Sequence, residues 1–573
     1  MSLRSVVSML DDLNYNVVLN VIEYLNVIDS GRLAATSKRY LYLVCEYRRL
    51  RGPEIAVSSS WDASNLRDRS AMEVALAPIE RLQMPPNLVL AFESPPDMLD
   101  DIELQGCLSY VLPSNAVVLG ACATDIQVNI GRKVQVSVES MSVASVMFAS
   151  FPNAVIRTFM FDGNIVPEGF QYSGSDMRKM AIQFEEFANE LLLTQHHWKS
   201  IIVYAAGQSA DFVGRFLSVM QSHTPHIEIV GGMCDSGYVT ILPSRNDLST
   251  TKTVRQLRLL IRSLGGRESE IDAAGEKSDL VDLALRLQNQ REGGNVETIN
   301  DGIFGIVLGG DVPVKSIVSR GVRRFTHEAP QSSSPYVVKT SGLYTSNGFE
   351  WNHHIQDCIH KETGRTISVI ELFTQARNNN ADYFGVRRPH DDGFELYDID
   401  EEFTLEEEAL SVPSNWTPDR EKGYDKSSED NLAGAEVDFF CLDGEACCQD
   451  VDRTLSLLRD QTQGEEVLGA IMFSCSGRGP RQCELIREEM MDATRFARAF
   501  PDVPCLGFYA GGEIGPMALV GNRNVFRKGR AAVQGFTAVF CLFIVPVVKR
   551  REYELDDSLD AVHAFIKERL TRN

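Results

Sequence analysis

The chain has 573 residues, which is too long for one ordinary hydrophobic core and predicts about three or four domains or large inserts. Its composition, 44% hydrophobic and 24% charged, is typical of a soluble globular protein. The net charge of −23 disfavours general binding to a nucleic-acid backbone, which requires clustered cations. We therefore expect no nucleic acid among the partners.

The cysteines and one long apolar segment indicate the compartment. The twelve cysteines form neither a disulfide framework nor a zinc-binding ladder, and Cys122, Cys475 and Cys541 lie inside apolar runs where reduced thiols pack well. Residues 531–548 are as apolar as a membrane span, but their β-branched and aromatic content favours buried strands. We expect a reducing location, cytoplasmic and nuclear, and no membrane span.

The first fifty residues have the periodicity of short helices. Apolar residues recur at three- and four-residue spacing from Leu13 to Leu25, and the turn "NVIDSG" separates them from further apolar positions up to Tyr47. Three short helices bury little apolar surface, so this module requires a partner or a neighbouring domain to cover its remaining face. The pattern leaves both alternatives open.

From Pro53 onward an α/β pattern occurs three times. Each copy has an apolar strand, a helical stretch, a second apolar strand that ends in small residues, and a later third strand. The expected strands are 88–92, 117–122 and 143–148, then 201–207, 227–232 and 302–308, and finally 468–475, 503–512 and 535–543. The expected fold class is α/β (mixed α+β): a small N-terminal three-helix module, then a large region of repeated strand-helix-strand units.

The chain between the first two strands of a copy is long enough for a crossover helix. We expect this helix at 211–222 in the second copy and at 483–500 in the third. In the third copy Leu485, Met490, Phe496 and Phe500 can form an apolar stripe.

Two inserts interrupt the repeats. Residues 243–300 contain "TVRQLRLLIRSLGG", a basic amphipathic segment that is either docked locally or binds a partner; its apolar side is Val254, Leu257, Leu260, Ile261 and Leu264. Residues 387–435 are rich in Asp and Glu, which favours a flexible, solvated loop. An amphipathic helix is expected at 553–571. The expected domains are 1–52, 53–330 and 331–573.

The strongest local candidate for a site is "FSCSGRGPRQCE". A buried strand runs into Ser476, Gly477, Arg478 and Gly479 and then into a helix, so backbone N–H groups and the Arg478 guanidinium could receive an anion. If the copies are adjacent, this loop meets "AGGE", which contains Gly511, Gly512 and Glu513, and Arg478 then faces Glu513. Both a ligand pocket and a structural ion pair with turn-forming glycines fit the residues.

Catalytic and metal chemistry have weaker signals. Cys475 borders the candidate loops, but the sequence supplies no His and acid in an arrangement that would activate it as a nucleophile. His354, Cys358 and His360 resemble zinc ligands, but a second ligand pair is missing nearby. We expect a non-catalytic protein with no metal and no cofactor.

The N-terminal module resembles an F-box. Leu13 opens it, Tyr24 and Leu25 end its first helix, Leu33 lies in the second, and Ser37 and Tyr40 take the usual Cys and Trp places. Asn14 departs from the family pattern, which has proline there. The resemblance implies that an apolar face binds a Skp-family adaptor; its residues would be Leu13, Val17, Val18, Ile22, Leu25, Leu33 and Tyr40.

The rest of the chain, apart from the two inserts, resembles the FIST domain family of sensory-type modules. The matching stretches are "VVLGACATD", "GAIMFSCSGRG" and "FPDVPCLGFYAGGEIGP". F-box and FIST proteins are substrate receptors of SCF ubiquitin ligases. The resemblance implies that the adaptor links this chain to cullin and a RING subunit, while the FIST region binds proteins for ubiquitination and proteasomal degradation. The alternative is a small-molecule sensor with a degenerate F-box, in which Cys475, Gly477, Arg478, Gly479, Gly511, Gly512 and Glu513 bind the ligand.

Overall fold

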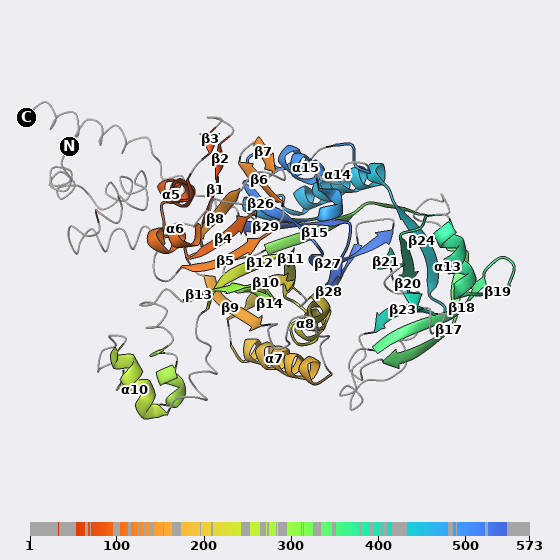
Figure 1. The fold of residues 1–573 in the computed structure, drawn as a ribbon, viewed down its shortest axis with the longest axis horizontal. Coiled ribbons are helices and arrows are strands. Elements are labelled where there is room, and N and C mark those ends of the chain that lie inside the picture. Colours follow the sequence, from red (N-terminus) through yellow and green to blue (C-terminus); the bar gives the residue numbers. More distant parts are fainter. Residues whose placement is uncertain are drawn as a thin grey trace, which may run out of the picture.

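Figure 1 shows the computed structural model, which describes Leu33 and most of residues 53–546. The longest gaps within that range are 95–103, 163–173, 242–252, 285–294, 325–333 and 415–431. The remaining residues of 1–52, and 547–573, lie outside the described part. The expected F-box helices and the expected helix at 553–571 therefore lie there too. The described chain is mixed α/β and rich in strands.

Three repeats with the same order of elements form the main body. In each, a helix, a first strand and a second helix lead to a second strand parallel to the first. An exchanged strand and its antiparallel partner follow, then a third strand antiparallel to the first. Repeat 1 contains α5 (Ala71–Arg81), β4 (Leu88–Glu93), α6 (Leu104–Val111), β5 (Val117–Cys122), β6 (Ile126–Ile130), β7 (Lys133–Val136), β8 (Ala144–Ser150) and β9 (Ala154–Asp162).

Repeats 2 and 3 follow the same order. Repeat 2 contains α7 (Gly174–Leu193), β10 (Trp198–Ala206), α8 (Ala210–His223), β11 (Glu228–Cys234), β12 (Ser236–Ile241), β13 (Asn295–Ile299), β14 (Gly302–Gly310) and β15 (Val314–Arg320). Repeat 3 contains α14 (Gly444–Gln461), β25 (Glu465–Cys475), α15 (Met491–Ala499), β26 (Cys505–Ala510), β27 (Glu513–Gly521), β28 (Val525–Gln534) and β29 (Thr537–Pro546). The nine strands expected from the sequence all correspond to strands of these repeats.

The exchanged strands join the repeats. β6 pairs with β26 of repeat 3, β12 with β5 of repeat 1, and β27 with β11 of repeat 2. Together with β1 (Glu54–Ser59), they complete three sheets of one common order: β1-β8-β4-β5-β12-β13, β9-β14-β10-β11-β27-β28 and β15-β29-β25-β26-β6-β7. Two of these sheets contain strands from both sides of residue 330. The regions expected as separate domains, 53–330 and 331–573, thus interleave in one body.

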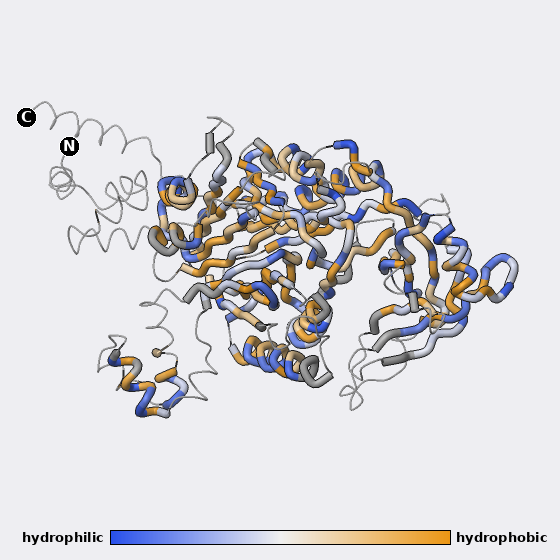
Figure 2. The backbone as a smooth tube through the Cα atoms, viewed as in Figure 1, coloured by the Kyte–Doolittle hydropathy of each residue, from blue (hydrophilic) through white to orange (hydrophobic). Residues whose placement is uncertain are grey.

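A single hydrophobic core lies between the three sheets. It includes one aromatic residue from the first strand of each repeat, Phe92, Tyr204 and Phe473, which we call the central aromatics. The ring centroids of Tyr204 lie 5.9 Å from those of both Phe92 and Phe473, within the range of favourable aromatic contacts. Figure 2 shows hydrophobic residues along these central strands.

A pair of helices covers the outer face of each sheet. In Figure 1 these pairs lie on three sides of the body, with α5 and α6 at the left, α14 and α15 at the top, and α7 and α8 at the bottom. Each pair buries apolar residues against its own sheet in a separate cluster. α5 begins with a capping box, in which the Ser70 hydroxyl accepts from the Glu73 N–H and the Glu73 carboxylate accepts from the Ser70 N–H.

The crossover helix of repeat 3 is shorter than the sequence indicates. The prediction of a helix across 483–500 is wrong, because α15 begins only at Met491. Met490 has a φ of 51°, a left-handed conformation that cannot continue a helix toward the N-terminus. Leu485, expected on the apolar stripe, is exposed, whereas Phe496 and Phe500 are buried.

A further group of strands, which we call the inserted sheet, lies between β15 and α14 in the chain and continues the sheet of repeat 2 through the pairing of β21 with β27. It contains β16 (Val322–Arg324), β17 (Tyr336–Thr345), β18 (Trp351–His360), β19 (Thr366–Ser368), α13 (Val369–Asn378), β20 (Tyr383–Arg387), β21 (Gly393–Asp398), β22 (Phe403–Thr404), β23 (Ala409–Ser414) and β24 (Glu436–Leu442). The expectation of a flexible loop at 387–435 is therefore wrong for β21, β22 and β23. Apolar residues of β21 and β23 are buried, including Phe394 and Leu410, which stabilises these strands despite the acidic composition of the stretch.

Two smaller units lie outside these sheets. β2 (Trp61–Asp62) and β3 (Arg67–Asp68) form a short hairpin. The basic segment of the other insert forms α10 (Val254–Ser263), which buries Leu257 and Ile261 against residues between 271 and 284. This agrees with local docking, although Val254, expected on the apolar side, is exposed. In Figure 1 α10 lies apart from the main body, at the lower left.

Close packing at the point where the chain enters the inserted sheet can be tested by substitution. Gly321 lies between β15 and β16, and a Cβ there would overlap the backbone of Cys447 in α14. We expect Gly321→Ala to lower the free energy of unfolding by about 1–3 kcal/mol, since overpacking forces the backbone to move. Gly214→Ala is the control, because no atom lies within 4 Å of its Cβ position in α8. In denaturant titrations, Gly321→Ala should have a lower unfolding midpoint than Gly214→Ala. Equal midpoints for the two variants would contradict the close contact between Gly321 and Cys447.

Candidate functional site

The residues singled out in the two glycine-containing loops lie at one junction between sheets. β25 ends at Cys475, the turn η3 (Ser476–Arg478) follows it, and Gly511 and Gly512 connect β26 to β27. Cys475 and Gly477 are half-buried, Arg478, Gly479, Gly512 and Glu513 are buried, and Gly511 is exposed. The structure thus brings together the loops that the sequence predicted to meet.

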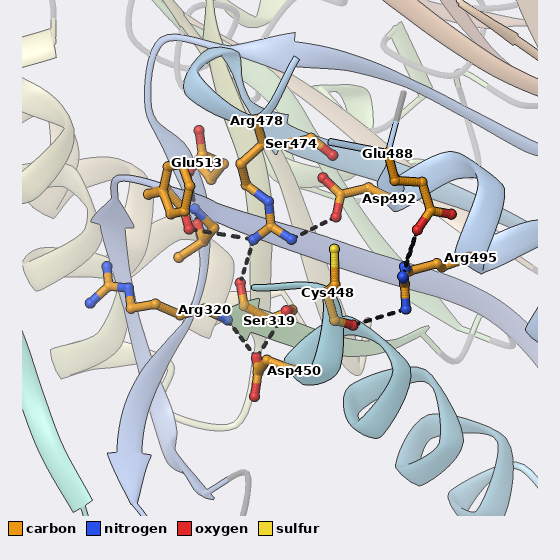
Figure 3. Close-up of polar contacts among 12 residues, drawn as sticks. Ser319, Arg320, Cys448, Asp450, Ser474, Arg478, Glu488, Asp492, Arg495 and Glu513 are labelled. Atoms are coloured by element: carbon orange, nitrogen blue, oxygen red, sulfur yellow. Dashed lines mark hydrogen bonds and ion pairs between the residues drawn. The ribbon is translucent and has the colours of Figure 1, made fainter. Parts of the chain in front are cut away.

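The Arg478 side chain is held by hydrogen bonds to other groups of the protein (Figure 3). Its Nη2 donates to the Asp492 carboxylate at 2.6 Å, and its Nη1 donates to the backbone carbonyls of Ser319 at 3.2 Å and Phe536 at 3.4 Å. Burial alone would lower the pKa of Arg478, but Asp492 raises it above its ordinary value, so the guanidinium stays charged. The expected pairing of Arg478 with Glu513 is wrong, because Asp492 takes that place.

The glycines do not form an anion cradle. In the described part of the chain, the helix expected directly after Gly479 begins only at Met491, and its first-turn residue Asp492 binds Arg478. A Cβ at Gly477 would have ordinary contacts of 3.5 Å or more. At Gly512 it would lie 2.9 Å from the Met233 sulfur, so the Met233 side chain would have to shift.

Glu513 is fully buried at the start of β27. Its Oε2 accepts hydrogen bonds from the Thr537 backbone N–H at 3.1 Å and from the Thr537 hydroxyl at 2.8 Å. Its Oε1 is buried and has no hydrogen-bond partner within the described residues. Burial raises the pKa of Glu513 to about 8, against the opposing effects of Thr537, Arg478 and Arg320. The carboxyl is therefore mostly protonated at neutral pH.

Arg320, at the end of β15, is a site residue that the sequence reasoning missed. It pairs in register with Thr537, and its side chain is 8% exposed. Its backbone N–H donates to Asp450 at 2.8 Å, whereas its guanidinium extends away from Asp450, as Figure 3 shows. Throughout the described part of the chain, no hydrogen bond or ion pair reaches this guanidinium, and its Nε is buried.

Tyr383 of the inserted sheet completes the group. The Arg320 guanidinium lies over its ring, 5.8 Å from the centroid, in a cation–π contact. The Tyr383 hydroxyl lies 3.6 Å from the Cβ position of Gly535, an exposed residue before β29. We call Arg320, Tyr383, Cys475, Glu513 and Thr537 the Arg320–Glu513 junction. It combines repeats 2 and 3 with the inserted sheet.

Cys475 enters the junction as a thiol. Burial raises its pKa to about 11, and Glu513 adds to this effect. A thiol with so high a pKa is protonated at neutral pH and is a weak nucleophile, which disfavours the cysteine-dependent chemistry considered from the sequence.

The three-fold arrangement shows how unusual this junction is. Equivalent residues can be found by following the strand registers from the central aromatics. Across the sheet from Tyr204, Phe92 and Phe473, the exchanged strands place Glu513, Gly237 and Ile126 at the same point. Of these three residues, Glu513 alone is ionisable. Repeat symmetry therefore does not require a buried carboxyl here.

The other sequence-predicted residues lie elsewhere or outside the described part. His354, Cys358 and His360 lie on the strand β18. In the described residues no group of three His, Cys, Asp or Glu side chains is arranged to hold a metal. Among the adaptor-binding residues, Leu33 alone is described, and it is helical and buried. No helix in the described ranges is long and apolar enough to cross a membrane.

Comparison with known proteins identifies part of this region. Residues 428–516 match the FIST C domain, a span that includes Cys475, Arg478, Asp492 and Glu513. Uncharacterized protein Mb0898c of Mycobacterium bovis and uncharacterized proteins MT0897 and Rv0628c of Mycobacterium tuberculosis are 32% identical over 111 residues. The match covers 19% of this chain, which spans about a quarter of the length of these relatives.

The buried carboxyl predicts a pH dependence of stability. In the unfolded chain Glu513 ionises near 4.5, whereas in the folded protein it keeps its proton up to about pH 8. Stability from this group is therefore complete below pH 4.5 and is lost as the pH rises through 8. We expect the melting temperature of the wild type to fall relative to that of Glu513→Gln between pH 5 and about 8.5. A constant difference between the two proteins would contradict the raised pKa.

The Arg478–Asp492 pair predicts a second test. Arg478→Met leaves the buried Asp492 carboxylate without its partner and should destabilise the protein by about 3–5 kcal/mol. The double variant Arg478→Met with Asp492→Leu removes both charges and should recover part of this loss. Chemical denaturation of the single and double variants measures the difference. Equal stability of Arg478→Met and the wild type would show that the ion pair is not structural.

Proposed function

We propose that the protein is a small-molecule sensor of the FIST type, with its ligand site at the Arg320–Glu513 junction. The observation that carries this proposal is the presence of two buried ionisable residues that each have a buried polar atom without a hydrogen-bond partner in the described residues, Arg320 Nε and Glu513 Oε1. Burying such groups without partners is costly, and they are tolerated mainly where they serve a function. The FIST C match ends three residues after Glu513, and FIST domains occur in signalling and sensing proteins.

The surroundings of the junction fit a regulatory role. It lies at the ends of strands where repeats 2 and 3 meet, a common position for ligand sites in α/β proteins. Tyr383 belongs to the inserted sheet, whose β21 also pairs with β27 directly. A ligand that contacts Arg320 and Tyr383 would therefore change the contact between the inserted sheet and the body, which supplies a route for a signal.

A ligand screen tests the sensor role. We expect at least one compound of a broad metabolite library to raise the melting temperature of the wild type, because a ligand that binds the folded state stabilises it. Arg320→Gln should abolish the shift. Arg365→Gln, at an exposed arginine of the inserted sheet, is the matched control and should retain it. A library that stabilises neither protein, or a shift that survives Arg320→Gln, would refute the site.

We also propose, from the F-box resemblance of residues 13–40, that the chain recruits a Skp-family adaptor, and through it cullin and a RING subunit. The FIST region would then present bound proteins for ubiquitination, without performing bond chemistry itself, by raising the local concentration of the substrate lysine. This role is compatible with ligand sensing, since a ligand could control substrate capture.

Co-purification tests the adaptor role. The wild type should co-elute with a Skp-family adaptor, and Ile22→Asp combined with Leu25→Asp should abolish the complex, because charges on an apolar docking face prevent its burial. The melting temperature of the FIST region should stay unchanged in this variant. Adaptor binding that persists without residues 1–52 would overturn the assignment.

A further inference from the structure

The Arg320 guanidinium is a buried cation whose neighbouring carboxylates are already engaged. Glu513 uses Oε2 to accept from Thr537. Glu395, which also acts on Arg320 electrostatically, is paired with Arg388 at 2.8 Å and with Arg530 at 3.2 Å. None of these carboxylates forms an ion pair with Arg320 among the described residues. Within the described residues, the Arg320 guanidinium therefore has no carboxylate paired with it.

Asp450 does not pair with the Arg320 guanidinium either. Its Oδ2 accepts from the Ser319 hydroxyl at 2.9 Å and from the Arg320 backbone N–H, and its Oδ1 pairs with Arg453. It thus fixes the end of β15 while the Arg320 side chain extends away from it (Figure 3). A guanidinium held in this way presents planar donors suited to a carboxylate.

The charge around Arg320 favours a ligand with a single negative charge. Tyr383 and Cys475 are neutral at pH 7, because burial raises the pKa of Tyr383 and raises that of Cys475 to about 11. Arg478 is neutralised by Asp492. Arg320 is thus the one cation of the junction without a partner. A phosphate dianion would need a second unpaired cation, whereas Arg478 is already paired with Asp492.

Glu513 supplies the second contact. Its Oε1 is buried without a partner, and at neutral pH the carboxyl carries a proton that it can donate to an anion. Ionisation would instead place a negative charge beside the bound ligand and repel it. The groups whose charges act on Glu513, or on Arg320 beside it, are Arg478, Cys475, Tyr383 and Glu395.

We propose that the Arg320–Glu513 junction binds small monocarboxylates. The ligand carboxylate pairs with Arg320 and accepts a hydrogen bond from the protonated Glu513 carboxyl. This assignment rests on the proposed function and names its ligand class. Tyr383, whose ring lies against the guanidinium, positions Arg320 and links the site to the inserted sheet.

The ligand class is tested on the full chain with defined probes. Sodium acetate, propionate and benzoate should raise the melting temperature, whereas sodium phosphate and methylammonium chloride at matched ionic strength should not. If phosphate or methylammonium stabilises instead, the carboxylate assignment is overturned while the sensor role stands. If neither these probes nor the metabolite library shifts the transition, both fail together.

Variants locate the binding within the junction. Arg320→Gln should weaken carboxylate binding about tenfold or more by calorimetry, because a charge-assisted contact is lost. If Arg320→Gln does not fold, Arg320→Lys keeps the charge but loses the planar donor geometry, and it should also weaken binding. Arg365→Gln should bind like the wild type. Unchanged affinity in either Arg320 variant would refute the assignment.

The proton carried by Glu513 gives a separate readout. Wild-type affinity for benzoate should fall as the pH rises through about 8, while Glu513→Gln, whose amide donates at every pH, should keep its affinity. A pH profile shared by both proteins would show that Glu513 does not contact the ligand.

Discussion

The exchange of one strand between repeats is the constraint on which the rest of the structure depends. No repeat completes its own sheet, because β6, β12 and β27 each pair with a strand of another repeat. The core between the sheets is shared in the same way, with its central aromatics drawn from all three first strands. Removing one exchanged strand would therefore expose a sheet edge in a second repeat as well as the core between all three.

This exchange also explains where the candidate site lies. β27 crosses from repeat 3 to the sheet of repeat 2, and its first residue, Glu513, reaches back to Thr537 at the start of β29. The crossing places a carboxyl between two sheets, where water is excluded and its pKa rises. The equivalent crossings carry Gly237 and Ile126, so the same scaffold is used for packing at two junctions and for polar chemistry at the third.

The sequence predicted the repeats well because their signal is local. Runs such as "VVLGAC" and "GAIMFSC" are almost wholly apolar, as strands buried on both faces should be, and all nine expected strands are present. Strand exchange was not predicted, since pairing between residues hundreds of positions apart leaves no local pattern. The prediction of a loop at 387–435 failed because Phe394 and Leu396, which fill a core, alternate with Glu395 in a stretch rich in acids.

The candidate site was predicted only in part, for a related reason. Glu513 and Cys475 were found through the glycines beside them, but Arg320 lies in a strand that the sequence pattern did not reveal. Its importance comes from what surrounds it: a ring from the inserted sheet and carboxylates that bond elsewhere. Arg478, the more conspicuous residue in the sequence, turned out to bind Asp492. Which arginine lacks a partner is a property of three-dimensional neighbours.

The pairing of β6 with β26 has a consequence for synthesis on the ribosome. The Asn129 side chain donates to the backbone of Ala493, 364 residues later. The first repeat therefore cannot complete its contacts until the third repeat has been synthesised. At ordinary elongation rates this wait lasts roughly 20–70 s, during which β6 and β7 have no sheet to join. Unpaired strand edges are prone to aggregate. The nascent chain is therefore expected to depend on chaperones until its last repeat emerges.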